Sequence, residues 1–208
     1  MEFWYDFAST YSYPAAMRIE ELAGQAGVAI EWRPFLLGPL FQRQGWNDSP
    51  FNIYPARGRY MWRDLERICA RNGLPFRRPT GFPRHSVLAA RVASLDETGA
   101  VLPALTRALF RANFAEDRDI GVPEVVGQVL AELRREAPGL PDPARLLARA
   151  VEPGNKERLR ARTEEAWEAG LFGAPSFVVD GELFWGQDRL EEAFAWTRGD
   201  RPVAAGGR

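Results

Sequence analysis

The sequence predicts an α/β fold in which a large all-helical insertion separates a β-α-β half from a β-β-α half. Three observations predict it. Short apolar segments flank one helical segment near the N-terminus, the middle of the chain has helical periodicity, and an Asp-Gly pair joins two apolar segments near the end. A length of 208 residues fits one domain that carries such an insertion.

The N-terminal half begins with a strand. Residues Glu2 to Phe7 alternate and are rich in aromatic side chains, which favours a half-buried strand. Tyr11 to Ala26 then place Ala, Ile and Leu at helical spacing, and Val28 to Phe35 return to strand character. Since a helix of this length connects the two strands, we expect them to be parallel.

The middle of the chain is predicted to be helical from Arg57 to Ala150. Gly or Pro interrupts the apolar periodicity at Asn72-Gly73, Gly99, Gly121 and Pro138-Gly139. These breaks divide the segment into five or six helices. We assign residues 41–165 to a helical insertion domain.

The C-terminal half is predicted to contain a hairpin and a closing helix. Ser176 to Val179 and Leu183 to Trp185 read as strands, and Asp180-Gly181 between them is a strong hairpin signal. Gln187 to Trp196 form the closing helix. Residues 1–40 and 166–198 then make up the main domain, and residues 199–208, with little to bury, form a mobile tail.

Composition excludes several classes of function. The formal net charge is -1 and no long run of Lys or Arg occurs, so nucleic acid is not an expected partner. No apolar run approaches the ~20 residues of a membrane helix and no signal segment is visible, which indicates a cytoplasmic protein without membrane contact. A single Cys and a single His predict no internal disulfide and no metal site, and Cys69 reads as a buried apolar residue.

The predicted order of elements, with Pro175 just before the third strand, is that of a thioredoxin-like fold. Four motifs make the resemblance more specific: "YDFASTYSYPA", "NDSPFNIYPARGRYMWRDLER", "GAPSF" and "DGELFWGQDRL". On these the chain resembles the 2-hydroxychromene-2-carboxylate isomerases, in the DsbA-like group that also holds kappa-class glutathione transferases. It departs from that pattern at Thr10, where these proteins usually have proline.

The resemblance implies glutathione as a cofactor and Ser9 as the catalytic residue. A helix N-terminus stabilises an anion, and a hydroxyl beside it can donate one more hydrogen bond to a thiolate. From position alone, Ser9 or Ser12 is explained equally well as a helix cap. The other three motifs favour the catalytic role for Ser9 and leave Ser12 as structural.

The resemblance also assigns residues to the binding of glutathione: Asn52, Arg57, Ala174, Pro175, Gly186, Asp188 and Arg189. It implies a cis Pro175, with the Ala174 backbone pairing with the cysteinyl part and Asp188 holding the γ-glutamyl end. Arg57 would meet the glycyl carboxylate. The alternative for the charged residues is an ordinary cap or a solvated loop side chain.

Two aromatic residues, Tyr11 and Trp62, are candidates for contact with an aromatic substrate, although most such residues are core. His85 is expected to open a helix at the surface rather than to act as a base.

The function that the resemblance implies is a glutathione-dependent isomerase. It would interconvert 2-hydroxychromene-2-carboxylate and trans-o-hydroxybenzylidenepyruvate, in aromatic hydrocarbon catabolism, by reversible addition of the glutathione thiolate. A kappa-like glutathione transferase or peroxidase and a non-catalytic glutathione- or peptide-binding module stay open as alternatives. Disulfide exchange is excluded because Ser9 and Ser12 occupy the positions of the paired cysteines. Relatives are commonly homodimers, and we expect the same here.

Overall fold

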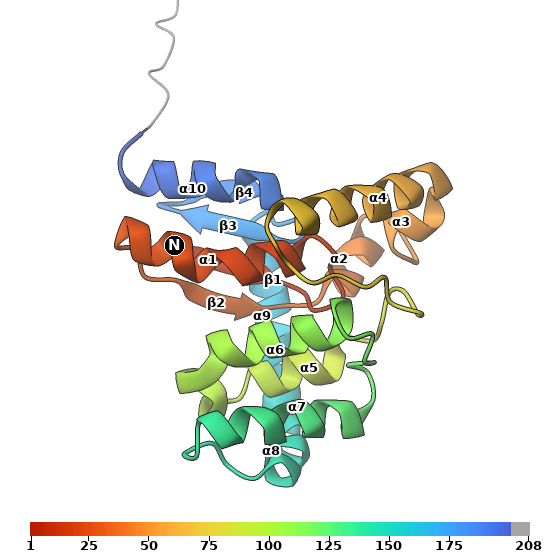
Figure 1. The fold of residues 1–208 in the computed structure, drawn as a ribbon, viewed down its shortest axis with the longest axis vertical. Coiled ribbons are helices and arrows are strands. Elements are labelled where there is room, and N and C mark those ends of the chain that lie inside the picture. The colour runs from red at the N-terminus through yellow and green to blue at the C-terminus, as the bar shows by residue number, and fades with distance from the viewer. Residues whose placement is uncertain (201–208) are drawn as a thin grey trace, which may run out of the picture.

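The computed structural model describes residues 1–200 and centres on a mixed sheet with the strand order β2-β1-β3-β4. Its strands are β1 Glu2–Tyr5, β2 Glu31–Pro34, β3 Ser176–Val179 and β4 Glu182–Trp185. β1 runs parallel to β2 and antiparallel to β3, and β3 pairs with β4 in a hairpin (Figure 1). Most of the predicted tail, residues 201–208, lies outside the described part of the chain.

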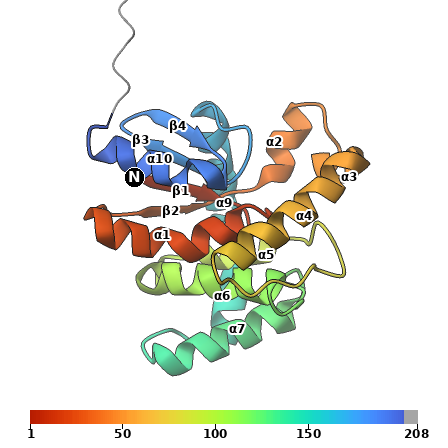
Figure 2. The same ribbon diagram turned by 45° about the horizontal axis from the view of Figure 1, so that its top comes forward.

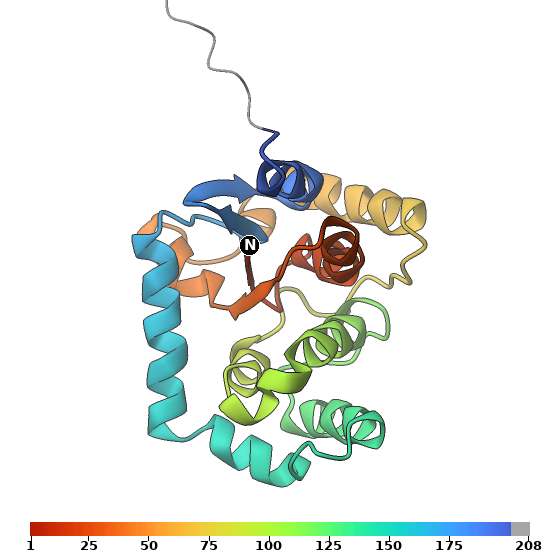
Figure 3. The ribbon, with the colours of Figure 1, turned by 90° about the vertical axis from the view of Figure 1, so that its left-hand side faces the viewer.

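Alternation along β1 sends its side chains into two separate apolar clusters. Phe3 and Tyr5 are fully buried and share a cluster with side chains of α1 (Ser12–Ala26) and α10 (Leu190–Thr197). Trp4 points the other way and packs with Phe35 and with residues of α2 and α9. The sheet is therefore covered on both faces, and Figure 3 shows α9, in cyan, on the side opposite α1.

The segment between β2 and β3 is helical. Its elements are α2 Leu37–Arg43, α3 Pro50–Ile53, α4 Pro55–Arg71, α5 Val87–Ala93, a 3-10 helix Asp96–Val101, α6 Leu102–Phe114, α7 Pro123–Glu136, α8 Pro143–Ala150 and α9 Pro153–Glu168. Figure 2 shows α6 and α7 below α1, and α2, α3 and α4 to the right of the sheet. Among residues 1–200, no helix combines the length and apolar character needed to cross a membrane.

The predicted α/β fold class is confirmed, and some predicted boundaries are wrong. β2 begins at Glu31 and not at Val28, because its pairing extends only along the four residues of β1. The closing helix starts with a 3-10 turn at Gln187–Arg189 before α10. His85 precedes α5 instead of opening it, since that helix begins at Val87. The division into two domains at residues 41 and 165 stays a prediction.

The hairpin was predicted from its turn residues, and its geometry explains why that signal is strong. Asp180 and Gly181 both have positive φ, 51° and 81°. Such a turn matches the twist of the flanking strands and is typical of Asp-Gly. The turn fixes the register in which Ser176 lies opposite Trp185. That register brings the end of β4 next to the loop that precedes β3.

Candidate functional site

The site is built around Ser9, in the loop between β1 and α1. The Ser9 hydroxyl donates a hydrogen bond of 2.9 Å to the carbonyl oxygen of Ala174. It accepts one of 3.2 Å from the backbone N–H of Ser12, at the start of α1. Only 8% of Ser9 is exposed. One hydroxyl therefore joins the first turn of α1 to the loop before β3.

The Ala174–Pro175 peptide bond is cis, as the resemblance implied. The Pro175 carbonyl accepts a 2.9 Å hydrogen bond from the N–H of Gly186, which follows β4. Three segments that are distant in sequence thus meet at one end of the sheet: the Ser9 loop, the Ala174–Pro175 loop and the segment that begins at Gly186.

Thr10 replaces the proline that the related isomerases usually have after the serine. Its side chain is buried, and its hydroxyl donates a hydrogen bond of 3.1 Å to the sulfur of Met61 on α4. A proline has no such donor. Thr10 therefore ties the Ser9 loop to α4.

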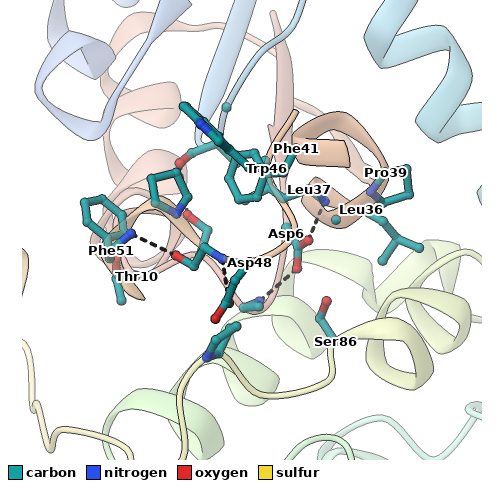
Figure 4. A pocket seen from close by; sticks show the side chains of 18 of the residues that line it. Asp6, Thr10, Leu36, Leu37, Pro39, Phe41, Trp46, Asp48, Phe51 and Ser86 are labelled. Carbon is teal, nitrogen blue, oxygen red and sulfur yellow. Dashed lines mark hydrogen bonds between the residues drawn. The ribbon is translucent and has the colours of Figure 1, made fainter. Parts of the chain in front are cut away.

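A cavity of about 730 Å³ opens on one side of Ser9, and we call it the aromatic cavity. Its wall includes seven Phe, Tyr and Trp side chains: Tyr11, Phe41, Trp46, Phe51, Phe82, Phe172 and Trp185. Figure 4 shows Phe41, Trp46 and Phe51 around it. Predominantly apolar walls with a few polar groups are typical of small-molecule sites. The aromatic cavity is suited to a flat apolar ligand.

A second cavity, of about 610 Å³, has a polar wall, and we call it the polar cavity. Its wall includes two aspartates and three arginines: Asp64, Asp188, Arg67, Arg71 and Arg189. Tyr11, Ala174 and Trp185 line both cavities. The two cavities therefore adjoin at Ala174, the residue that Ser9 contacts.

Most charges of the polar cavity are already paired. Arg67 lies 3.0 Å from Asp64, which also accepts a 3.1 Å hydrogen bond from the Tyr11 hydroxyl. Burial, and then the charge of Asp64, raise the pKa of Tyr11, so its phenol stays neutral and can donate. Arg71 has no ion-pair partner among the described residues. Its guanidinium is available to an anionic ligand.

Seven of the predicted site residues line the two cavities: Ser9, Tyr11, Arg57, Ala174, Gly186, Asp188 and Arg189. Arg57 lies in the wall of the aromatic cavity, with its guanidinium carbon 4.5 Å from the centre of the Tyr54 ring. It is therefore separate from the arginines of the polar cavity. His85 is exposed and also lines the aromatic cavity.

Three predicted residues, Asn52, Trp62 and Pro175, do not line either cavity. The Asn52 amide is exposed and donates hydrogen bonds to the Asp48 carboxylate, at 3.1 and 3.2 Å, and to the Phe82 carbonyl. Trp62 is 8% exposed and belongs to the main hydrophobic cluster, with its ring 4.9 Å from that of Phe82. Trp62 therefore packs in the core beside Phe82, which lines the aromatic cavity, and its substrate contact stays a prediction.

Residues 1–194 match the family described as the DSBA-like thioredoxin domain. The chain belongs to the DsbA-like thioredoxin family. It is 30% identical over 197 residues to the 2-hydroxychromene-2-carboxylate isomerase of Sphingobium xenophagum, covering 92% of this chain and 94% of that protein. A protein of the same name from Pseudomonas putida is 25% identical over 193 residues, covering 91% of this chain and 90% of that protein.

Solved structures agree with this assignment at the level of the fold. A 2-hydroxychromene-2-carboxylate isomerase has a TM-score of 0.81 at 24% identity, with 95% of this chain and 94% of that chain covered. The cytosolic disulfide reductase DsbM from Pseudomonas aeruginosa has a TM-score of 0.63 at 16% identity, with 96% of this chain and 97% of that chain covered. The predicted thioredoxin-like architecture is confirmed.

This DsbA-like domain lacks the thiols that disulfide exchange requires. Ser9 and Ser12 stand at the junction of β1 and α1, and Cys69 is the single cysteine of the chain. Cys69 is 1% exposed, and burial raises the pKa of its thiol to about 12. A thiolate at neutral pH is therefore not available from the chain itself.

Asp6, which the sequence analysis did not select, is the buried acid of the site. It lines the aromatic cavity, is 3% exposed, and accepts hydrogen bonds from the N–H groups of Ala8, at 2.8 Å, and Leu37, at 2.7 Å. Figure 4 shows its carboxylate between Leu37 and Ser86. An acid directly after an apolar strand was the available signal. Burial raises the pKa of Asp6, while the two N–H groups oppose that shift.

Asp6→Asn should change how the stability of the domain depends on pH. Between the unfolded pKa of about 3.9 and the raised folded pKa, the unfolded chain has lost its proton and the folded chain keeps it. Rising pH therefore lowers the free energy of unfolding of the wild type across this window. Asp6→Asn cannot titrate and so removes this pH dependence. It should also lower the free energy of unfolding by about 1–3 kcal/mol, because an amide N–H then faces the backbone donors. Urea unfolding of wild type and Asp6→Asn from about pH 4 upward measures the pH dependence and the loss of stability.

The decisive quantity is the difference in unfolding free energy between wild type and Asp6→Asn. It should shrink as pH rises and level off above the folded pKa. A difference that grows with pH would mean that the Asp6 carboxylate is stabilised as an anion.

Proposed function

We propose that this protein is a glutathione-dependent isomerase of an aromatic unsaturated ketoacid, interconverting 2-hydroxychromene-2-carboxylate and trans-o-hydroxybenzylidenepyruvate. One observation carries the proposal: Ser9, at the N-terminal end of α1, contacts the residue at which the polar and aromatic cavities adjoin. The names of the curated relatives support the reaction class.

The charged side chains of the polar cavity are complementary to the charged groups of glutathione. Glutathione carries two carboxylates and one ammonium group besides its thiol, and three arginines and two aspartates line this cavity. Arg71 and Arg189 would meet carboxylates, and Asp188 would meet the ammonium group. Arg57, in the first turns of α4, lines the other cavity, so we assign the carboxylates of glutathione to Arg71, the last residue of α4, and to Arg189.

When bound, glutathione supplies a thiolate that adds reversibly to the conjugated carbon of the ketoacid and so permits rotation about the former double bond. Ser9 has one hydroxyl proton, and it points to the Ala174 carbonyl. A peptide N–H of the ligand that pairs with this carbonyl would release the hydroxyl proton. Ser9 would then donate to a thiolate while still accepting from Ser12 N–H.

The aromatic cavity suits the second substrate. Its volume of about 730 Å³ lies within the range of roughly 300–1,000 Å³ that is typical of small-molecule sites. Its apolar wall would exclude water around the reacting carbon, which strengthens the hydrogen bond from Ser9. The neutral phenol of Tyr11, at the border of the two cavities, donates its one proton to Asp64, and the residue forms part of both walls.

The purified protein should isomerise 2-hydroxychromene-2-carboxylate only when glutathione is present, as followed by the absorbance of substrate and product. Ser9→Ala should lower kcat by about 10²-fold, the typical effect of losing one donor to a developing anion. The matched control is Ser12→Ala. The Ser12 hydroxyl is buried and has no hydrogen-bond partner among the described residues, so activity should change less than about twofold.

Other outcomes of this assay would favour the alternatives. A stable conjugate of glutathione with the substrate would favour a transferase. Glutathione binding without turnover of any electrophile would favour a binding module. Equal activity of wild type and Ser9→Ala would contradict the role of Ser9.

Arg71→Gln should weaken glutathione binding about tenfold, because a hydrogen bond to a charged group contributes ~1.5–3 kcal/mol and this site is partly exposed. Arg63→Gln is the matched control on the same helix. Arg63 pairs with Glu66 at 2.7 Å and lines neither cavity, so its loss should change affinity less than about twofold. Isothermal titration calorimetry measures the affinity of each variant for glutathione. Equal affinities of wild type and Arg71→Gln would exclude the polar cavity as the binding site.

A further inference from the structure

Trp185, the last residue of β4, lies at the border of the two cavities. It is one of the residues that line both of them, together with Tyr11 and Ala174. It is 52% exposed, more than half of what the residue could show to solvent. The Phe172 ring lies beside it, with ring centroids 4.8 Å apart. The indole therefore offers an accessible aromatic surface next to the Ser9 junction.

Gly173 fixes the position of this indole. A Cβ atom on Gly173 would lie 2.3 Å from Trp185 Nε1 and 3.0 Å from its Cε2, so the indole would have to move if any side chain were added there. The indole thus packs directly on the backbone one residue before Ala174. The predicted motif "GAPSF" accordingly has a second function for its glycine: the absent side chain leaves room for the Trp185 ring.

An aromatic wall at this point would select for an aromatic ligand. Pairs of aromatic rings gain about 0.5–1.5 kcal/mol beyond the burial of their area, and an aliphatic ring of similar size does not gain this term. The polar cavity, which the indole also borders, is lined by charged groups. An apolar ligand in the aromatic cavity can therefore cover the face of the Trp185 indole that is turned toward that cavity.

We propose that Trp185 is a specificity-determining residue whose indole, positioned by Gly173, stacks on the aromatic ring of the electrophile. The inference rests on the proposed function and deepens it, because it assigns the selection of aromatic over aliphatic ketoacids to one side chain. Gly173 is a positioning residue that acts through Trp185.

The test compares the binding of two unreactive carboxylates, 2-naphthoate and decalin-2-carboxylate, to the glutathione-loaded protein by calorimetry. Trp185→Leu should weaken 2-naphthoate binding about three- to tenfold and change decalin-2-carboxylate binding less than about twofold. Trp185→Phe, which keeps an aromatic ring, should retain most of the selectivity. Gly173→Ala should have the effect of Trp185→Leu, since the indole is displaced.

Trp167→Leu is the matched control. Trp167 is 37% exposed on α9, lies under the Arg43 guanidinium and lines neither cavity. Its loss should leave the affinity for both carboxylates unchanged. Circular dichroism establishes that each variant is folded.

Several results would overturn the inference. One is a wild type that does not prefer 2-naphthoate, and another is equal weakening of both carboxylates in Trp185→Leu. A third is a Trp185→Leu variant that binds both carboxylates as the wild type does but no longer self-associates. That result would assign the exposed indole to an interface between copies of the chain. Because binding is measured without turnover, a wild type that selects 2-naphthoate through Trp185 but does not isomerise would contradict the proposed function alone.

Discussion

The hydrogen bond from the Ser9 hydroxyl to the Ala174 carbonyl is the interaction on which the site depends. It connects residues 165 positions apart in sequence and holds the first turn of α1 against the loop with the cis Pro175. The same hydroxyl satisfies the Ser12 N–H, one of the unpaired donors at a helix start. The serine therefore serves the fold as a cap and, in our proposal, serves the chemistry as a donor.

The two cavities divide the work of recognition by polarity. Charged side chains of α4 and of the segment after β4 line one, and aromatic side chains line the other. On α4, the spacing of Asp64, Arg67 and Arg71 places all three on one face of the helix. A zwitterionic peptide and an apolar electrophile can thus approach the same point from different sides, with Trp185 at the border of the two cavities.

Local patterns predicted much of the fold, and long-range packing decided the rest. Alternation in β1, helical spacing in α1 and the Asp180-Gly181 turn all act within a few residues, so the sequence revealed them. The proximity of Ser9 and Ala174 was available only through the family resemblance. The burial of Trp62 in the core was not predictable in the same way, because sequence alone does not say which face of an amphipathic helix meets a cavity.

The central claim is that Ser9 stabilises a thiolate that the chain itself does not supply, and a titration of bound glutathione tests it most directly. Cys69 is silent below about pH 10, because burial raises its pKa to about 12, so thiolate absorbance there reports the ligand. We predict a pKa for bound glutathione roughly 1–2 units below the ordinary thiol value of about 8.5, and a rise of about 1 unit in Ser9→Ala. Identical titrations of wild type and Ser9→Ala would contradict the claim.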